Sequence, residues 1–345
     1  MDTSAFGFPL ETILIFFVTI GFSVYMDLHA HRQQREIGIR DASLWSLFWV
    51  GLALAFYGYL WLRFSKHWAD LYLQGYVLEK SLSIDNLMVF MAIFSSFGIK
   101  GILQHRILYW GIIGALVFRA VFVVIGTSLF FASVWVGFLF AAVVAWSGWK
   151  MLTASGGDKE ITDYSEHWSV KMTEKMMPIF PRLHLERFFI TRKVAQDLMD
   201  ADPSLKVSRM SAFMATPAFL CLMAIETSDV MFAFDSVPAV IAVTQEPLLV
   251  YAAMIFAILG LRSLYFVLAV LTRYLVHLEK AVIALLFFIA IKLALHSFNH
   301  AVFDTGIDIG SNLSLLIVLG TLAAGVVASF LFPGRDEESP GAASR

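Results

Sequence analysis

The sequence predicts an all-helical protein that crosses a membrane several times. Of its 345 residues, 59% are hydrophobic and 15% are charged, and the mean hydropathy is +0.75. A soluble protein of this size carries about 25% charged residues. Apolar stretches of about 20 residues, enough to cross the hydrocarbon core as helices, recur along most of the chain. A backbone in lipid must satisfy its hydrogen bonds internally, so we assign these stretches as helices.

We predict about nine spans, at residues 9–28, 43–63, 72–97, 107–131, 133–153, 212–236, 247–271, 279–299 and 311–332. Lysine and arginine gather between spans 1 and 2, 3 and 4, 5 and 6, and 7 and 8, and in the C-terminal tail. The opposite side carries only Arg63 and Lys66. Because basic residues accumulate on the side that is not translocated, we expect the N-terminus outside and the C-terminus inside.

The predicted domains are residues 1–153 (spans 1–5, first repeat 72–153), a cytoplasmic loop at 154–211, residues 212–332 (spans 6–9, second repeat 212–299) and a cytoplasmic tail at 333–345. The tail is rich in Gly, Pro and Ser and is expected to be disordered. The N-terminus lacks the basic start of a cleavable signal peptide, so the first span is expected to be retained.

The two predicted repeats have the same order of charged residues. Each begins with an acidic segment, continues with a span that carries an arginine (Arg119 or Arg262), and ends with a span that carries a lysine (Lys150 or Lys292). A repeat of three spans enters the membrane in the opposite direction the second time. Inverted repeats of this kind build many secondary transporters, whose sites lie near the midplane between the two halves.

Five acidic residues fall inside the third and sixth spans, in the segments EKSLSIDN (79–86) and ETSDVMFAFD (226–235). They are Glu79, Asp85, Glu226, Asp229 and Asp235. Each costs at least about 2.5–3.5 kcal/mol in the middle of a spanning helix, so these residues must face a cation, water or basic partners. Glu79/Asp85 and Asp229/Asp235 share a six-residue spacing. The repeat can therefore be aligned with Glu79 opposite either Glu226 or Asp229.

The helical period limits how these acids can converge. At 100° per residue, Glu226 and Asp229 share a face, whereas Asp235 lies about 120° from Asp229. Local unwinding would allow all of them to face one centre. Pro238 has no N–H for the carbonyl of Phe234, so we expect an unwound stretch beside Asp235.

The polar residues of the two segments predict an all-oxygen cation site. Additional candidate donors are Ser83, Asn86 and Ser228, and candidate charge partners are Lys80, Arg119 and Arg262. Oxygen donors suit Mg²⁺, Ca²⁺ and Mn²⁺ rather than Zn²⁺ or Cu⁺. A purely structural network of ion pairs is the alternative. Asp27, near the inner end of the first span, is either a cytoplasmic access residue with His29 and His31 or an interfacial acid facing Arg32.

The segments EKSLSIDN and ETSDVMFAFDSVPAV, the stretch GLRSLYF and the Asp27-containing first span resemble the TerC/Alx family of integral membrane proteins, within the LysE superfamily. The resemblance implies export of Mn²⁺ from the cytoplasm, most closely as in the Alx-type exporters. It also implies that the five acids line the metal pathway. The family takes its name from tellurite resistance, and some relatives are linked to the assembly of membrane proteins.

The expected function is therefore secondary transport, not enzymatic catalysis. The expected transported substrate is Mn²⁺, and no cofactor is expected. Protons are the expected counter-ion, because clustered carboxylates raise one another's pKa values. Alternatives are an exchanger for Ca²⁺ or another hard cation, and a non-transporting scaffold that contacts partners through the 154–211 loop. The expected partners are the metal ion and the lipid bilayer of a bacterial inner membrane. Nucleic acid is not an expected partner, and the oligomeric state is left open.

Overall fold

The chain is helical almost throughout its described part. In the computed structural model, the described residues are 4–5, 8–30, 38–154, 164–184, 187–202, 205, 207, 210–271, 277–302 and 309–332. Among them, side chains are left undescribed at 4, 5, 24, 27–30, 154, 270, 271, 300 and 302.

Thirteen helical elements and four short strands follow one another along this part of the chain. The helices are α1 (Leu10–Ala30), α2 (Ile39–Arg63), α3 (Lys66–Ser96), α4 (Ile102–Ala132), α5 (Val134–Ala154), the 3₁₀ turn η1 (Tyr164–Glu166), α6 (Trp168–Met176), α7 (Arg192–Ala201), α8 (Pro217–Thr244), α9 (Pro247–Ile258), α10 (Leu261–Leu271), α11 (Leu278–Val302) and α12 (Ser311–Leu331). The strands are β1 (Ser4–Ala5), β2 (Phe8–Pro9), β3 (Phe189–Thr191) and β4 (Phe213–Ala215); β1 pairs with β2 and β3 with β4, both antiparallel.

Six helices in the described part are long and apolar enough to cross a membrane: α2, α4, α5, α8, α11 and α12. The pair α9 and α10, bent by 47°, would make a seventh span. The other two predicted spans fall on α1, of which Leu10–Ser23 is the apolar part with described side chains, and on α3, which holds the first acidic segment. The prediction of a multi-pass helical membrane protein is thus confirmed, while the count of nine spans stays a prediction.

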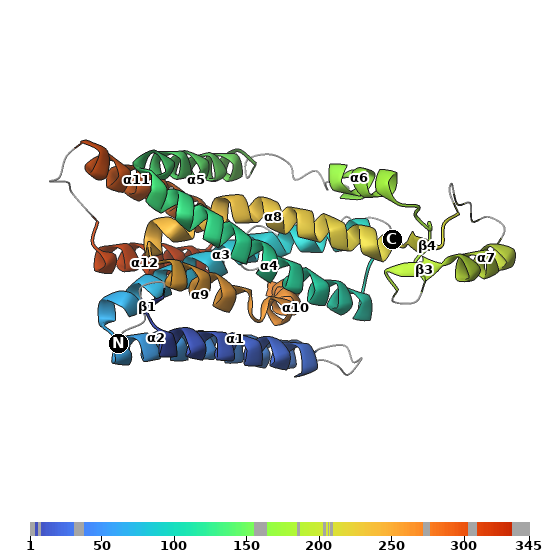
Figure 1. Ribbon diagram of the computed structural model, residues 1–345, viewed down its shortest axis with the longest axis horizontal. Helices are drawn as coiled ribbons and strands as arrows, with labels where there is room; N and C mark the ends of the chain where they lie inside the picture. The colour runs from blue at the N-terminus through green and yellow to red at the C-terminus, as the bar shows by residue number, and fades with distance from the viewer. Residues whose placement is uncertain are drawn as a thin grey trace, which may run out of the picture.

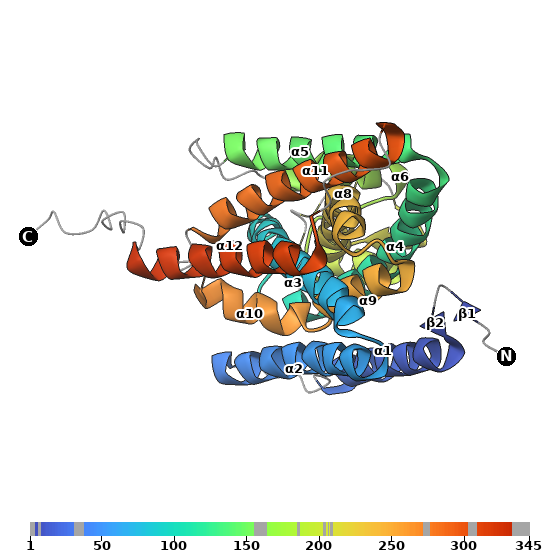
Figure 2. The same cartoon turned by 90° about the vertical axis from the view of Figure 1, so that its left-hand side faces the viewer.

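The helices are arranged in layers around α3, α8 and α9. In both views α1 and α2 lie on one side of these three helices and α5 and α11 lie on the opposite side (Figures 1 and 2). Along the bundle, α5 packs against α11, α4 packs against α8, and α9 packs against α3. Nearly all of α9 is buried. The polar segments on α3 and α8 therefore lie in the middle of the protein.

Large apolar side chains cover the outside of the bundle. Phe22, Leu62, Trp135 and Leu316 are among many that are exposed on α1, α2, α5 and α12. Soluble monomers rarely expose contiguous apolar surface of this extent, and a lipid environment would cover it. The distribution of exposed residues therefore agrees with the apolar helices in indicating a membrane protein.

The region predicted as a cytoplasmic loop contains a small folded unit. It consists of β3 and α7, which gather with β4 at one end of the long axis (Figure 1), whereas η1 and α6 pack against α3 and α8, respectively. Phe180, Ile190, Ala195 and Met214 form its own small core. The backbone N–H of Tyr164 donates to Ser96 Oγ at 3.2 Å and joins η1 to the end of α3.

The helix formed by α9 and α10 is interrupted next to α2. Residue Gly260 has φ +78°, a conformation that an L-residue rarely adopts, and it separates the two helices. Trp49 of α2 packs against it so closely that a Cβ at position 260 would lie 2.7 Å from Trp49 Cγ. Only glycine satisfies both the backbone conformation and this contact, so the interruption is fixed by the sequence.

Candidate functional site

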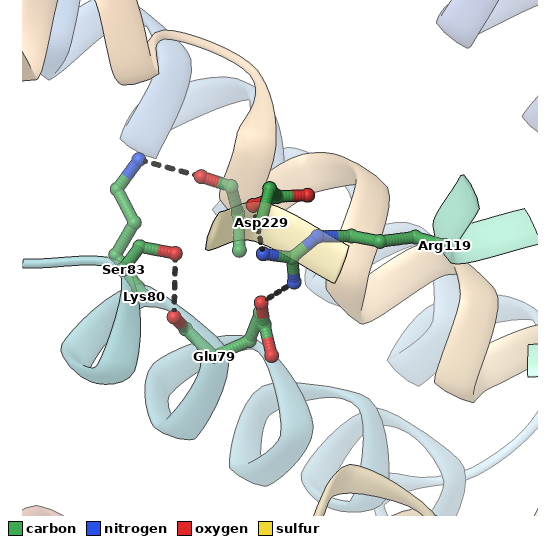
Figure 3. Close-up of polar contacts among 6 residues, drawn as sticks. Glu79, Lys80, Ser83, Arg119 and Asp229 are labelled. Carbon is green, nitrogen blue, oxygen red and sulfur yellow. Dashed lines mark hydrogen bonds and ion pairs between the residues drawn. The ribbon is translucent and has the colours of Figure 1, made fainter. Parts of the chain in front are cut away.

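The two acidic segments meet at one arginine inside the bundle. Arg119 of α4 donates through Nη1 to Glu79 Oε1 of α3 and through Nη2 to Asp229 Oδ1 of α8 at 3.1 Å (Figure 3). All three side chains are buried. The predicted convergence of the third and sixth spans is therefore present for one acid from each segment. Arg119 takes the predicted part of a charge partner.

The charges of this trio do not cancel. Two ionised carboxylates and one guanidinium leave a net charge of −1. In addition, Glu79 Oε2 and Asp229 Oδ2 are buried and have no hydrogen-bond partner among the described residues. A buried carboxylate oxygen without a partner costs free energy. The trio is therefore able to accept a further cation or proton.

Glu226 lies three residues before Asp229 on α8 and also faces α4. Its carboxylate occupies the place that a side chain on Gly114 would fill, since a Cβ there would overlap both carboxylate oxygens. Glu226 Oε2 is likewise buried without a partner within the described part of the chain. The expectation that Glu226 and Asp229 share a helix face agrees with this geometry, and the absence of a side chain at Gly114 makes room for the first of them.

We expect Gly114→Ala to be less stable than Gly111→Ala by up to about 1–3 kcal/mol, because the added methyl group displaces the buried Glu226 carboxylate. Gly111→Ala, three residues earlier on α4, is the matched control. Its Cβ would meet Ile225 Cγ2 at 3.4 Å, an ordinary contact, so the greater helix propensity of alanine should raise stability by about 0.5–1 kcal/mol. Unfolding of both variants in detergent measures the difference, and Glu226→Ala should relieve the effect at Gly114. Equal stability of the two glycine variants would show that Glu226 does not need this space.

The hydrogen bonds of Arg119 described above do not include the other two acids of the predicted site, although Asp235 lies within electrostatic range of its guanidinium. Asp235 interacts with Ser147 of α5 through a side-chain hydrogen bond. Asp85 is half-buried on α3, as is Asn86. Among the described residues, no group of three or more His, Cys, Asp and Glu side chains is arranged so that it could hold a metal ion. The prediction that all five acids line one cation pathway therefore stays a prediction.

Helix continuity limits how many of the five acids can point at Arg119. Both α3 and α8 continue without a break through their acidic segments, and α8 continues through Pro238. The unwound stretch predicted beside Asp235 is therefore absent, which corrects that expectation. On a continuous helix, Asp85 and Asp235 point about 120° away from Glu79 and Asp229.

The predicted hydroxyl donors bond to their own helices. Ser83 Oγ donates to the carbonyl of Glu79 at 2.8 Å, and Ser228 Oγ donates to the carbonyl of Ala224 at 2.8 Å. These are bonds to the residue four positions earlier, a common arrangement for serine within helices. Each hydroxyl oxygen keeps lone pairs, so the two serines remain candidate donors.

The sequence predicts Lys80 as a charge partner of the acids. Its hydrogen bonds go instead to backbone carbonyls at the interruption between α9 and α10. Its Nζ donates to the carbonyl of Ala257 at 3.0 Å and lies 3.4 Å from that of Leu259. Figure 3 shows the side chain reaching away from Glu79 and Arg119 toward a carbonyl oxygen. Lys80 directly follows Glu79 on α3. Because consecutive side chains on a helix differ by 100°, the two cannot point to the same place.

Arg262 and Asp27 complete the predicted set. Arg262 is buried near the start of α10, directly after the interruption. Asp27 lies in α1, but its side chain and that of His29 are outside the described part of the structure, as is the whole of His31.

A buried acid near the opposite end of α3 was missed by the sequence analysis. The carboxylate of Asp70 accepts hydrogen bonds from Tyr57 Oη at 3.1 Å and from Lys66 Nζ at 2.8 Å. The predicted span began at residue 72, whereas α3 begins at Lys66, so Asp70 was left in a loop. The spacing of Lys66 and Asp70, four residues apart, is a signal of a helix that would have found it.

A buried ionic trio within a bundle of long apolar helices defines a multi-pass integral membrane protein with a charged interior site. Residues 64–337 match the family described as the integral membrane protein TerC family. The chain belongs to this family.

Relatives match nearly the whole chain. The tellurium resistance protein TerC of Serratia marcescens is 49% identical and that of an Alcaligenes species is 48% identical, each over 98% of both chains. The Alx membrane protein of Escherichia coli strain K12 is 32% identical over 82% of this chain and 84% of its own. The TerC proteins are thus more similar to this chain than that Alx protein, although the motifs were expected to place it nearest the Alx type. No solved structure matches the chain.

Proposed function

We propose that this protein is a secondary transporter that exports divalent metal cations from the cytoplasm, with Mn²⁺ as the leading substrate. The observation that carries the proposal is the meeting of Glu79 and Asp229, one from each acidic segment, at a single buried arginine. Each of these carboxylates keeps a buried oxygen without a partner among the described residues. Carboxylate oxygens are ligands that Mn²⁺, Mg²⁺ and Ca²⁺ accept, and acids of this kind inside a membrane mark ion pathways.

The trio suggests how an empty carrier reduces its uncompensated negative charge. Without a metal ion, Arg119 neutralises part of the charge of Glu79 and Asp229 and prevents the two acids from repelling each other. A divalent cation would compete with the guanidinium for the same oxygens. Protons are the proposed counter-ion, because protonation of the acids is the other way to remove their charge.

The packing pattern supports the proposed inverted repeat of residues 72–153 and 212–299. In the proposed repeat, α3, α4 and α5 correspond to α8, α9–α10 and α11. The contact between α4 and α8 then corresponds to the contact between α9 and α3. The contact between α5 and α11 joins two helices that are counterparts of each other in the repeat. The pairing of Glu79 with Asp229 favours the alignment based on the six-residue spacing. In this proposal α1 and α3 also cross the membrane, giving nine spans with the N-terminus outside.

The names of the TerC relatives state tellurium resistance but no transported species. Tellurite is an oxyanion, and a site with two buried carboxylates and a net charge of −1 would repel it. A cation is therefore the better fit to the trio. We propose that resistance in such proteins follows indirectly from metal homeostasis rather than from movement of tellurite through this site.

Metal uptake into inside-out proteoliposomes tests the proposal. We expect Glu79→Gln and Asp229→Asn, which keep side-chain size but remove charge, to abolish Mn²⁺ uptake. Glu166→Gln, on the exposed pair with Lys171, is the matched control and should transport at the wild-type rate. A panel of Mn²⁺, Mg²⁺ and Ca²⁺ would fix the selectivity. Uptake that persists unchanged in both trio variants would remove the proposal.

The small folded unit at the end of the bundle supports the alternative scaffold function, since it presents a separate surface. A scaffold would not need to bind metal. In that case millimolar Mn²⁺ should leave the melting temperature of the detergent-purified protein unchanged, whereas a transporter should be stabilised by its substrate.

A further inference from the structure

The interruption between α9 and α10 holds a positive charge that does not belong to the ionic trio. The Lys80 ammonium lies 3.0 Å from the carbonyl oxygen of Ala257 and 3.4 Å from that of Leu259. In a continuous helix the carbonyl of Ala257 would accept the N–H of Leu261. The interruption at Gly260 ends α9 at Ile258 and makes this oxygen available.

The end of α9 is a favourable place for a cation. The C-terminus of a helix carries roughly −0.5 of an elementary charge, concentrated on its last carbonyls. Inside a membrane protein these carbonyls cannot rely on bulk water. In transporters with interrupted helices, the half-helix C-terminal ends and the freed carbonyls coordinate the coupling Na⁺ or proton.

We propose that the end of α9 is a site for a monovalent cation that the protein fills with the ammonium group of its own Lys80. A lysine ammonium carries the single charge of an alkali cation and donates hydrogen bonds to carbonyl oxygens. The wild-type protein then needs no free Na⁺ or K⁺ at this place. Removal of the ammonium leaves a set of carbonyls that an alkali cation can occupy.

Contacts other than those of Lys80 hold the backbone at the end of α9 in its interrupted conformation. The packing of Trp49 on Gly260 holds the interruption from the side of α2, and Leu259 N–H donates to the carbonyl of Ile255 at 2.9 Å. Lys80 directly follows Glu79 on α3, so a movement of α3 would change the Arg119 trio and the end of α9 together. A role of the site in transport rests on the proposed function, but its occupancy by a cation does not.

The test is the salt dependence of thermal unfolding of Lys80→Met in detergent. Methionine keeps an unbranched side chain but lacks the charged terminal atom, which leaves room for an ion. Melting temperatures are compared in NaCl, KCl and choline chloride at equal ionic strength. We expect Na⁺ or K⁺ to raise the melting temperature of Lys80→Met by about 2–4 °C over choline, with saturation, as for a ligand that binds only the folded state. The wild type and Lys80→Arg, which keep a cation, should show no difference.

Recovery of monodisperse protein in each salt replaces the melting curve if Lys80→Met is too unstable to melt cooperatively. Identical behaviour of Lys80→Met in choline, Na⁺ and K⁺ would overturn the inference, as would an equal response of the wild type. The Mn²⁺ uptake experiment is independent of this result. Loss of the proposed export function would leave a cation response of Lys80→Met intact, and the reverse also holds.

Discussion

Arg119→Met should lower the free energy of unfolding by about 3–5 kcal/mol, the usual cost of removing one partner from a buried ion pair. The substitution keeps an unbranched apolar side chain but leaves Glu79 and Asp229 buried beside each other without their shared positive charge. Their mutual repulsion adds to the cost of desolvation. Unfolding of the purified protein in detergent, followed by temperature or denaturant, measures the loss.

Two further variants separate this effect from a general loss of packing. Arg182→Met removes an exposed guanidinium that lies 3.4 Å from Asp202, and it should change stability little because solvent screens such pairs. Neutralising the acids in the Arg119→Met background, with Glu79→Gln and Asp229→Asn, should restore part of the lost stability. A stable Arg119→Met protein, or no recovery in the triple variant, would contradict the assignment of Arg119 as the shared counter-charge.

The membrane fold could be predicted because lipid imposes simple rules on the sequence. A long apolar segment must be helical, and its length is set by the bilayer. The same rule made the boundaries of α3 hard to predict, because its charged residues interrupt the apolar pattern. The predicted span at 72–97 left out the first turns of the helix and with them Asp70, which lies buried between Tyr57 and Lys66.

The site could be predicted only in part, because the sequence does not specify how helices rotate against one another. The cost of buried charge identified Glu79, Asp229 and Arg119 as residues that need partners. It did not show that one arginine would hold both acids, nor that Lys80 would turn to the end of α9. Those contacts depend on packing between segments that are far apart in the sequence, 40 residues for Arg119 and Glu79 and 110 for Arg119 and Asp229.

The interruption of a spanning helix was predicted in the wrong place for a similar reason. Pro238 suggested unwinding of α8, since proline removes a backbone hydrogen bond. A buried helix can tolerate that loss when its neighbours hold it, and α8 remains continuous. The actual interruption at Gly260 carries a weaker local signal, a single glycine in an apolar run, and it is fixed by the contact with Trp49.

Mn²⁺ should stabilise Arg119→Met more strongly than it stabilises the wild type. If the guanidinium and the metal ion compete for Glu79 and Asp229, removal of the guanidinium frees both carboxylates and raises their affinity for a divalent cation. A ligand present at 100 times its dissociation constant stabilises the folded state by about 2.7 kcal/mol, enough to offset much of the loss caused by the substitution. Melting curves of both proteins over a Mn²⁺ titration measure this directly.

The matched control for this rescue is Arg119→Met combined with Asp229→Asn, in which one of the two carboxylates is neutral. The rescue by Mn²⁺ should then be lost, because a divalent cation would meet one charge instead of two. The same titration with choline or K⁺ at equal ionic strength removes simple screening as the cause. Equal Mn²⁺ shifts in the wild type and Arg119→Met would mean that the arginine does not occupy the place of the metal, and that any transported cation binds elsewhere in the bundle.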